Sequence, residues 1–166
     1  MNLRVIAITL VVIFSLVLQA TIFAELAHVG LTIVPDLVLI IAVSYGLLKG
    51  PWYGGIVGLT AGLLSDLYAG GLIGVGALNK MLSGFLAGLL EKTIFKDNLL
   101  IPAISLLVAT VFHEFLFFLI GGALGWHFGA ILSIIPRIFV LALYNAALAP
   151  LVYQQFHKLE IRCTNA

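Results

Sequence analysis

The sequence predicts an all-α integral membrane protein in which six transmembrane helices form one domain over residues 1–166. Hydrophobic residues make up 63% of the chain and charged residues 9%, a composition that is too apolar for a water-soluble globular protein. The apolar runs approach the roughly 20 residues that a helix needs to cross a hydrocarbon core. Helices are predicted rather than strands, because the runs lack the two-residue alternation of barrel strands and a helix satisfies its own backbone hydrogen bonds.

The first three predicted helices cover residues 4–25, 36–48 and 52–68. The run after Arg4 is longer than the roughly 7–15-residue apolar core of a signal peptide, so we expect it to be retained as the first helix. Pro35 and Asp36 begin the second helix and Pro51 precedes the third, since proline is tolerated in a first turn. The second helix is short for a bilayer. We expect either that its neighbours bury it or that residues 31–34 extend it.

The last three predicted helices cover residues 72–91, 98–120 and 130–153. The glycines from Gly70 to Gly76 predict a flexible turn at the start of the fourth helix. Pro102 lies in the first turns of the fifth helix, where its missing N–H group matters least. The tail over residues 154–166 mixes apolar and basic residues. It is expected to lie along the cytoplasmic surface or to extend into solvent.

The basic residues predict the orientation in the membrane. Six of the eight Lys and Arg residues fall on one side of the alternating spans: Arg4, Lys49, Lys92, Lys96, Lys158 and Arg162. The loops on the other side, about residues 25–35, 68–71 and 121–130, contain no Lys or Arg. Cytoplasmic loops are the ones enriched in these residues, so both termini are predicted in the cytoplasm. The net charge of +1 gives no electrostatic reason to expect nucleic acid binding.

Glycines at intervals of four indicate close helix packing. They lie in the third predicted helix, at Gly54, Gly58 and Gly62, and in the fourth, at Gly84 and Gly88. Small residues one turn apart let two helix backbones approach closely in a membrane. Two interpretations follow: the glycines pack helices of this chain together, or one glycine face docks the helix of a partner.

Ionisable residues inside the apolar runs are the candidate functional residues. The cluster comprises Asp36, Asp66, Asn79, Lys80, His113, Glu114 and Arg137. At about 1.5 Å of rise per residue, its charged members all fall in the outer half of their spans. Charged groups in a membrane normally pair, so we expect Glu114 with Arg137 and Lys80 with Asp66. The cluster is interpreted as internal ion pairs, as a recognition site for a partner or small polar ligand, or as a proton or ion relay.

No catalytic motif is recognisable. His113-Glu114 begins a metalloprotease-like His-Glu-x-x-His, but Phe117 occupies the second histidine position. Asp36 and Asp66 lack the Gly-x-Gly-Asp context of an intramembrane protease, and capping a helix N-terminus explains Asp36 at a span edge. Cys163 is the sole cysteine, which excludes a disulfide framework and a cysteine-based metal site. We therefore expect no enzyme activity, no cofactor and no metal.

The middle of the chain, about residues 30–90, resembles the rod shape-determining protein MreD family. The resemblance rests on an ordered set: Pro35-Asp36-Leu37, Tyr45-Gly46-Leu47, Gly50, Gly54, Gly58, Gly62-Leu63-Leu64-x-Asp66 and Gly74-x-Gly76-Ala77-Leu78. It implies a bacterial inner-membrane protein of the cell-elongation (peptidoglycan synthesis) machinery. The expected partners are MreC first, then MreB, RodA and a class B penicillin-binding protein.

The same resemblance implies a compact bundle similar to the S component of energy-coupling-factor transporters. Two functions are therefore expected from the sequence. One is a non-catalytic scaffold that binds MreC. The alternative is an S-component-like binder or transporter subunit for a small polar ligand in the outer half of the bundle.

Overall fold

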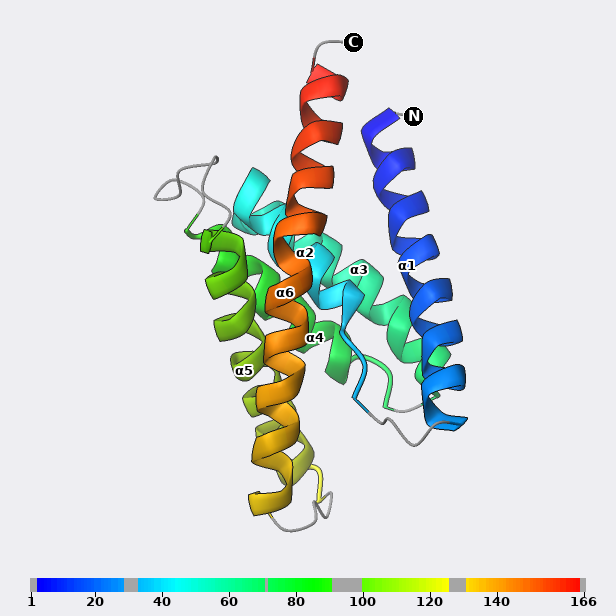
Figure 1. The fold of residues 1–166 in the computed structure, drawn as a ribbon, viewed down its shortest axis with the longest axis vertical. Coiled ribbons are helices and arrows are strands. Elements are labelled where there is room, and N and C mark those ends of the chain that lie inside the picture. Colours follow the sequence, from blue (N-terminus) through cyan, green and yellow to red (C-terminus); the bar gives the residue numbers. More distant parts are fainter. Residues whose placement is uncertain (1–2, 29–32, 71, 91–99, 126–130, 165–166) are drawn as a thin grey trace.

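The computed structural model describes residues 3–28, 33–70, 72–90, 100–125 and 131–164. Six α-helices account for nearly all of these residues (Figure 1). The helices are α1 (Leu3–His28), α2 (Leu37–Lys49), α3 (Pro51–Ala69), α4 (Val75–Gly88), α5 (Leu100–Ala123) and α6 (Ile131–Thr164). By length and composition, two of the described segments are long and apolar enough to cross a membrane: Leu100–Ala123 and Ile134–Ile161.

The short helix α2 lies at the centre of the bundle and contacts each of the other helices. Every residue from Val38 to Leu48 is buried. The chain does not extend α2 upstream, because residues 33–36 are not helical and Asp36 is the N-cap. Of the two expectations for this segment, burial behind neighbouring helices is therefore the one observed.

Glycine and proline set the ends of α2, α3 and α4. Gly50 has φ 97° and joins α2 to α3, and Pro51 follows it as the first residue of α3. Gly70 ends α3 in the left-handed conformation, with φ 68°, which glycine adopts without steric cost. Gly74, with φ 106°, begins α4. These turns fold α2, α3 and α4 back on one another.

Contact between α3 and α4 is the most extensive in the molecule. A Cβ atom at Gly54 would meet the carbonyl oxygen of Gly84, and one at Gly58 would meet that of Lys80. A Cβ atom at Gly62 would lie 2.6 Å from Cα of Ala77. A Cβ atom at Gly88 would likewise meet the backbone of Pro51. The five predicted glycines thus face other parts of this chain, which leaves them no free face for a partner's helix.

Helix α6 extends eleven residues beyond the predicted end at residue 153, to Thr164. The predicted end of the sixth helix is therefore wrong, because residues 154–164 continue α6. The physical reason is that the tail has its own packing partners: Phe156 is buried beside the ring of Tyr45, and Glu160 forms an ion pair with Lys49. Figure 1 shows that α1 begins and α6 ends at the same end of the molecule.

Candidate functional site: a buried ion pair inside the bundle

Asp36 is the centre of the candidate site, where the chain enters α2. Its carboxylate Oδ1 accepts a hydrogen bond from the N–H of Leu39 at 2.9 Å, which caps the helix N-terminus. Its own backbone N–H donates to Oδ1 of Asn145 at 2.9 Å. Asp36 is therefore held both through its side chain and through its backbone.

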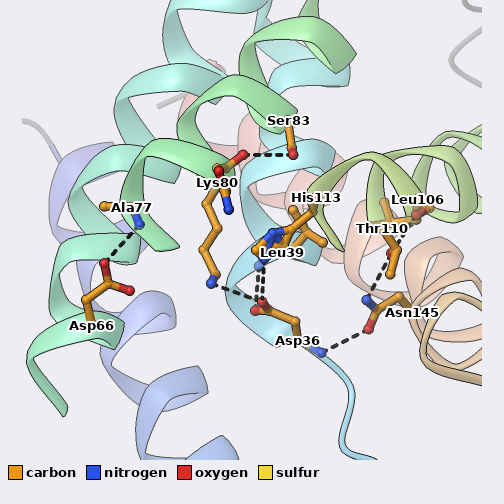
Figure 2. Close-up of polar contacts among 11 residues, drawn as sticks. Asp36, Leu39, Asp66, Ala77, Lys80, Ser83, Leu106, Thr110, His113 and Asn145 are labelled. Carbon is orange, nitrogen blue, oxygen red and sulfur yellow. Dashed lines mark hydrogen bonds and ion pairs between the residues drawn. The ribbon is translucent and has the colours of Figure 1, made fainter. Parts of the chain in front are cut away.

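Lys80 of α4 pairs with Asp36. Its ammonium Nζ lies 3.1 Å from Asp36 Oδ2, and the two side chains are 7% and 15% exposed. Figure 2 shows the lysine side chain extending from α4 towards the carboxylate in front of α2. The sequence-based pairing of Lys80 with Asp66 is thus wrong. An oppositely charged partner this close offsets much of the cost of burying both groups.

Asp66 has a different role, at the end of α3. Its Oδ2 accepts hydrogen bonds from the N–H groups of Gly74 at 2.8 Å and Ala77 at 3.1 Å. These are donors of the first turn of α4, which lack partners within the helix. Gly76 has no room for a Cβ atom because Asp66 Oδ1 occupies that space. Asp66 therefore closes the turn between α3 and α4 and lies apart from the ion pair (Figure 2).

His113 of α5 approaches the ion pair from a third helix. Its Nε2 lies 3.9 Å from Asp36 Oδ2, which is too long for a hydrogen bond. The side chain is 8% exposed, and Nδ1 has no hydrogen-bond partner among the described residues. Its position is close enough for an electrostatic contact with the carboxylate.

Asn145 and Thr110 extend the polar cluster to α6 and α5. Nδ2 of Asn145 donates to Oγ1 of Thr110 at 3.0 Å, and that hydroxyl donates to the carbonyl of Leu106 at 2.7 Å. Both side chains are fully buried. Four separate parts of the chain thus meet at one point: the segment before α2, α4, α5 and α6.

Asp36 lies beside the middle of α6, and its depth in the membrane stays a prediction. We expected Asp36 at the outer edge of a span, with the charged residues confined to the outer half. Asn145, which binds the backbone of Asp36, lies fourteen residues after the start of α6, or about 21 Å along it. Asp36 is therefore in the interior of the bundle. It reaches this position because residues 33–36 are not helical and Figure 1 shows them entering the bundle before α2 begins.

Three of the predicted site residues, Asn79, Glu114 and Arg137, form no side-chain hydrogen bond or ion pair with the residues of this cluster. Asn79 is fully buried, yet neither of its amide atoms has a hydrogen-bond partner within the described part of the chain. Glu114 is half-buried and Arg137 is exposed. They interact electrostatically, but among the described side chains they form no ion pair, contrary to the predicted pairing.

Sequence reasoning missed Thr110 and Asn145. A signal was present for Asn145, since it is the one amide side chain in the predicted sixth span, residues 130–153. Polar side chains in membrane helices commonly hydrogen-bond across to a neighbouring helix. Thr110 gave a weaker signal, because threonine in a helix often bonds only to the preceding turn.

The fold is an all-helical bundle in which two described helices are long and apolar enough to span a membrane, and its interior holds a buried ion pair and an amide network. A family model described as rod shape-determining protein MreD matches residues 1–159, so the chain belongs to the MreD family. No curated protein and no solved structure matches the chain. Membership in this family of membrane proteins gives the chain a role in determining rod cell shape, within a structural rather than an enzymatic family.

Proposed function

We propose that this chain is a non-catalytic scaffold of the bacterial cell-elongation machinery, and that it binds MreC in the inner membrane. The observation that carries the proposal is the family match over residues 1–159. MreB, RodA and a class B penicillin-binding protein belong to the wider complex. The described chemistry agrees with a scaffold, because Asp36, Lys80 and Asn145 hold helices in place.

We further propose six membrane crossings with both termini in the cytoplasm. The excess of Lys and Arg on one side supports this orientation. The start of α1 and the end of α6 at one end of the molecule also support it (Figure 1). At about 1.5 Å per residue, the 34 residues of α6 measure about 51 Å. The last turns of α6 then extend beyond a hydrocarbon core of about 30 Å.

The orientation is tested with the single native cysteine, Cys163. A maleimide that cannot cross membranes should label it in inside-out vesicles and not in intact spheroplasts. The double variant Cys163→Ser with Leu124→Cys moves the cysteine to an exposed position just past α5. It should be labelled in intact spheroplasts and not in inside-out vesicles. Labelling of both positions from the same side would contradict the six-crossing topology.

The scaffold function is tested by depletion and by co-purification. Rod-shaped cells depleted of the protein should become round, and tagged protein should retain MreC after mild detergent extraction. Normal rods after complete depletion would contradict the shape role, whereas round cells without retained MreC would contradict only the choice of partner.

A second candidate function is an S-component-like binder of a small polar ligand. The observation that favours it is Asn79, whose fully buried amide has no partner among the described residues. Nδ1 of His113 is unpartnered in the same sense. A thermal shift of the purified protein with a vitamin or a cell-wall precursor headgroup would support this candidate. That shift should disappear in Asn79→Leu, and its absence with every compound tried would remove the candidate.

A further inference from the structure

Two charged residues, one towards the end of α5 and one near the start of α6, have no hydrogen-bonded or ion-paired partner in the described part of the chain. Asp36 is paired with Lys80, Lys49 with Glu160, and Asp66 caps α4. Glu114 of α5 and Arg137 of α6 make neither a hydrogen bond nor an ion pair with a described residue. The two charges attract each other electrostatically, but neither has a hydrogen-bond partner among the described residues. A charge without such a partner is costly inside a membrane, and such residues usually mark a functional contact.

Both residues lie on a part of the bundle that is poorly covered, which we call the α5–α6 tip: residues 114–123 of α5 and 134–141 of α6. No residue from 114 to 120 or from 134 to 141 is buried. The lower ends of α5 and α6 lie beside each other in Figure 1. The tip therefore leaves side chains of both helices available for contact with another molecule.

The two charged residues lie at different distances from the nearer ends of their helices. Arg137 is six residues from the start of α6, about 9 Å, so its long side chain can extend to the headgroups. Glu114 is nine residues from the end of α5, about 14 Å, and its side chain is too short to do the same. A lipid surface therefore accounts for Arg137 alone, whereas a hydrogen-bonding helix accounts for both.

We propose that the α5–α6 tip docks one membrane-spanning helix of a partner protein, which supplies polar or charged side chains at the depth of Glu114 and Arg137. The partner's donor would bind the Glu114 carboxylate, and its acceptor would bind the Arg137 guanidinium. Gly122 lies two turns beyond Glu114 on the same side of α5, and open space surrounds the position of its missing Cβ atom. A second helix backbone has room to approach there. This inference rests on the proposed function, in which that partner is MreC.

Site-specific photo-crosslinking tests the docking surface in cells that contain MreC. The crosslinking residue replaces Phe115, Leu119 or Phe139 at the tip, all about 60% exposed. Control positions are Ile56 and Leu67 on α3, which are 58% and 60% exposed. The tip positions should crosslink MreC at least several-fold more strongly than the controls. Stronger crosslinking from α3, or none from the tip while MreC still co-purifies, would overturn the docking surface without affecting the proposed function.

Charge removal gives an independent readout. Glu114→Gln and Arg137→Met should each lower the MreC that co-purifies by roughly threefold or more, the loss expected for one polar contact between membrane helices. Lys158→Met removes an exposed cation from the same helix, α6, and should leave co-purification unchanged. Unchanged co-purification in both tip variants would overturn the inference. Absence of MreC with the unaltered protein would overturn the choice of partner and this inference together.

Discussion

Nζ of Lys80 lies 3.1 Å from Oδ2 of Asp36, which joins α4 to the entrance of α2. The same aspartate caps α2 through Leu39 and is bound through its N–H group by Asn145 of α6. One residue thus fixes the central helix relative to two others. This arrangement gives the bundle interior a defined geometry, which dispersion contacts between apolar helices specify only weakly.

Breaking the ion pair should destabilise the protein strongly. Lys80→Met leaves the Asp36 carboxylate buried without its counter-charge, so we expect a loss of about 3–5 kcal/mol in the free energy of unfolding. The double variant Asp36→Asn with Lys80→Met removes both charges and keeps a side chain that caps helices well. It should recover much of the loss. Reversible unfolding in detergent measures the cycle, and additive effects of the two changes would contradict a direct pair.

The amide network should contribute less than the ion pair. Asn145→Ala removes the acceptor for the Asp36 N–H group, so we expect a loss of about 1–3 kcal/mol in the free energy of unfolding. Thr110→Val removes the acceptor for the Asn145 amide and the hydroxyl that donates to the Leu106 carbonyl in the preceding turn. Its expected cost is about 0.5–1.5 kcal/mol. Thr110→Ser keeps the hydroxyl and serves as the control. A larger loss in the free energy of unfolding for Thr110→Val than for Asn145→Ala would contradict the conclusion that the Asn145 contacts contribute more to stability.

Alanine substitutions should destabilise the protein at glycines packed against another helix and leave stability unchanged at glycines on the open surface. Gly58→Ala places a Cβ atom against the backbone carbonyl of Lys80, so α3 and α4 must move apart. We expect a clear drop in thermal stability. Gly122→Ala meets nothing within 4 Å and should leave stability unchanged or raise it by up to about 1 kcal/mol. Equal effects of the two substitutions would contradict the observed packing of α3 on α4.

The end of α6 should depend on its contact with α2. Glu160 pairs with Lys49 and accepts a hydrogen bond from the Tyr45 hydroxyl at 3.1 Å. Glu160→Lys places a second cation beside Lys49, and their repulsion should release the end of α6 from α2. We therefore expect proteases to cleave the segment that follows residue 157 faster than in the unaltered protein. The pair is partly exposed, with side chains 27% and 13% accessible, so the cost in stability should be at most about 1 kcal/mol.

The charge swap, Lys49→Glu with Glu160→Lys, is the matched control for that variant. It should restore protection against cleavage, because it re-forms an ion pair at the same place. A swap variant cleaved as fast as Glu160→Lys alone would show that the ion pair does not hold the end of α6.

The helical class, the number of helices and most of their starts were predictable from the sequence. Apolar runs, Pro51 and the turn glycines determine where helices begin through interactions between neighbouring residues. Such features can therefore be recognised in a single sequence. The predicted C-terminal end of α6 and the predicted pairing of Lys80 with Asp66 were wrong for the opposite reason. Glu160 and Phe156 keep α6 helical through contacts with α2, and no pattern within residues 154–164 reveals those contacts.

The sequence by itself determined that this chain forms apolar helices with a few costly ionisable residues, because hydropathy and turn residues act over short stretches. Only the tertiary structure decided which charges meet. Asp36 reaches Lys80 and Asn145 because a non-helical segment enters the bundle, whereas Asp66 is taken up by the first turn of α4. Pairing in three dimensions depends on how helices are placed against one another, and periodicity along the chain carries no information about that placement.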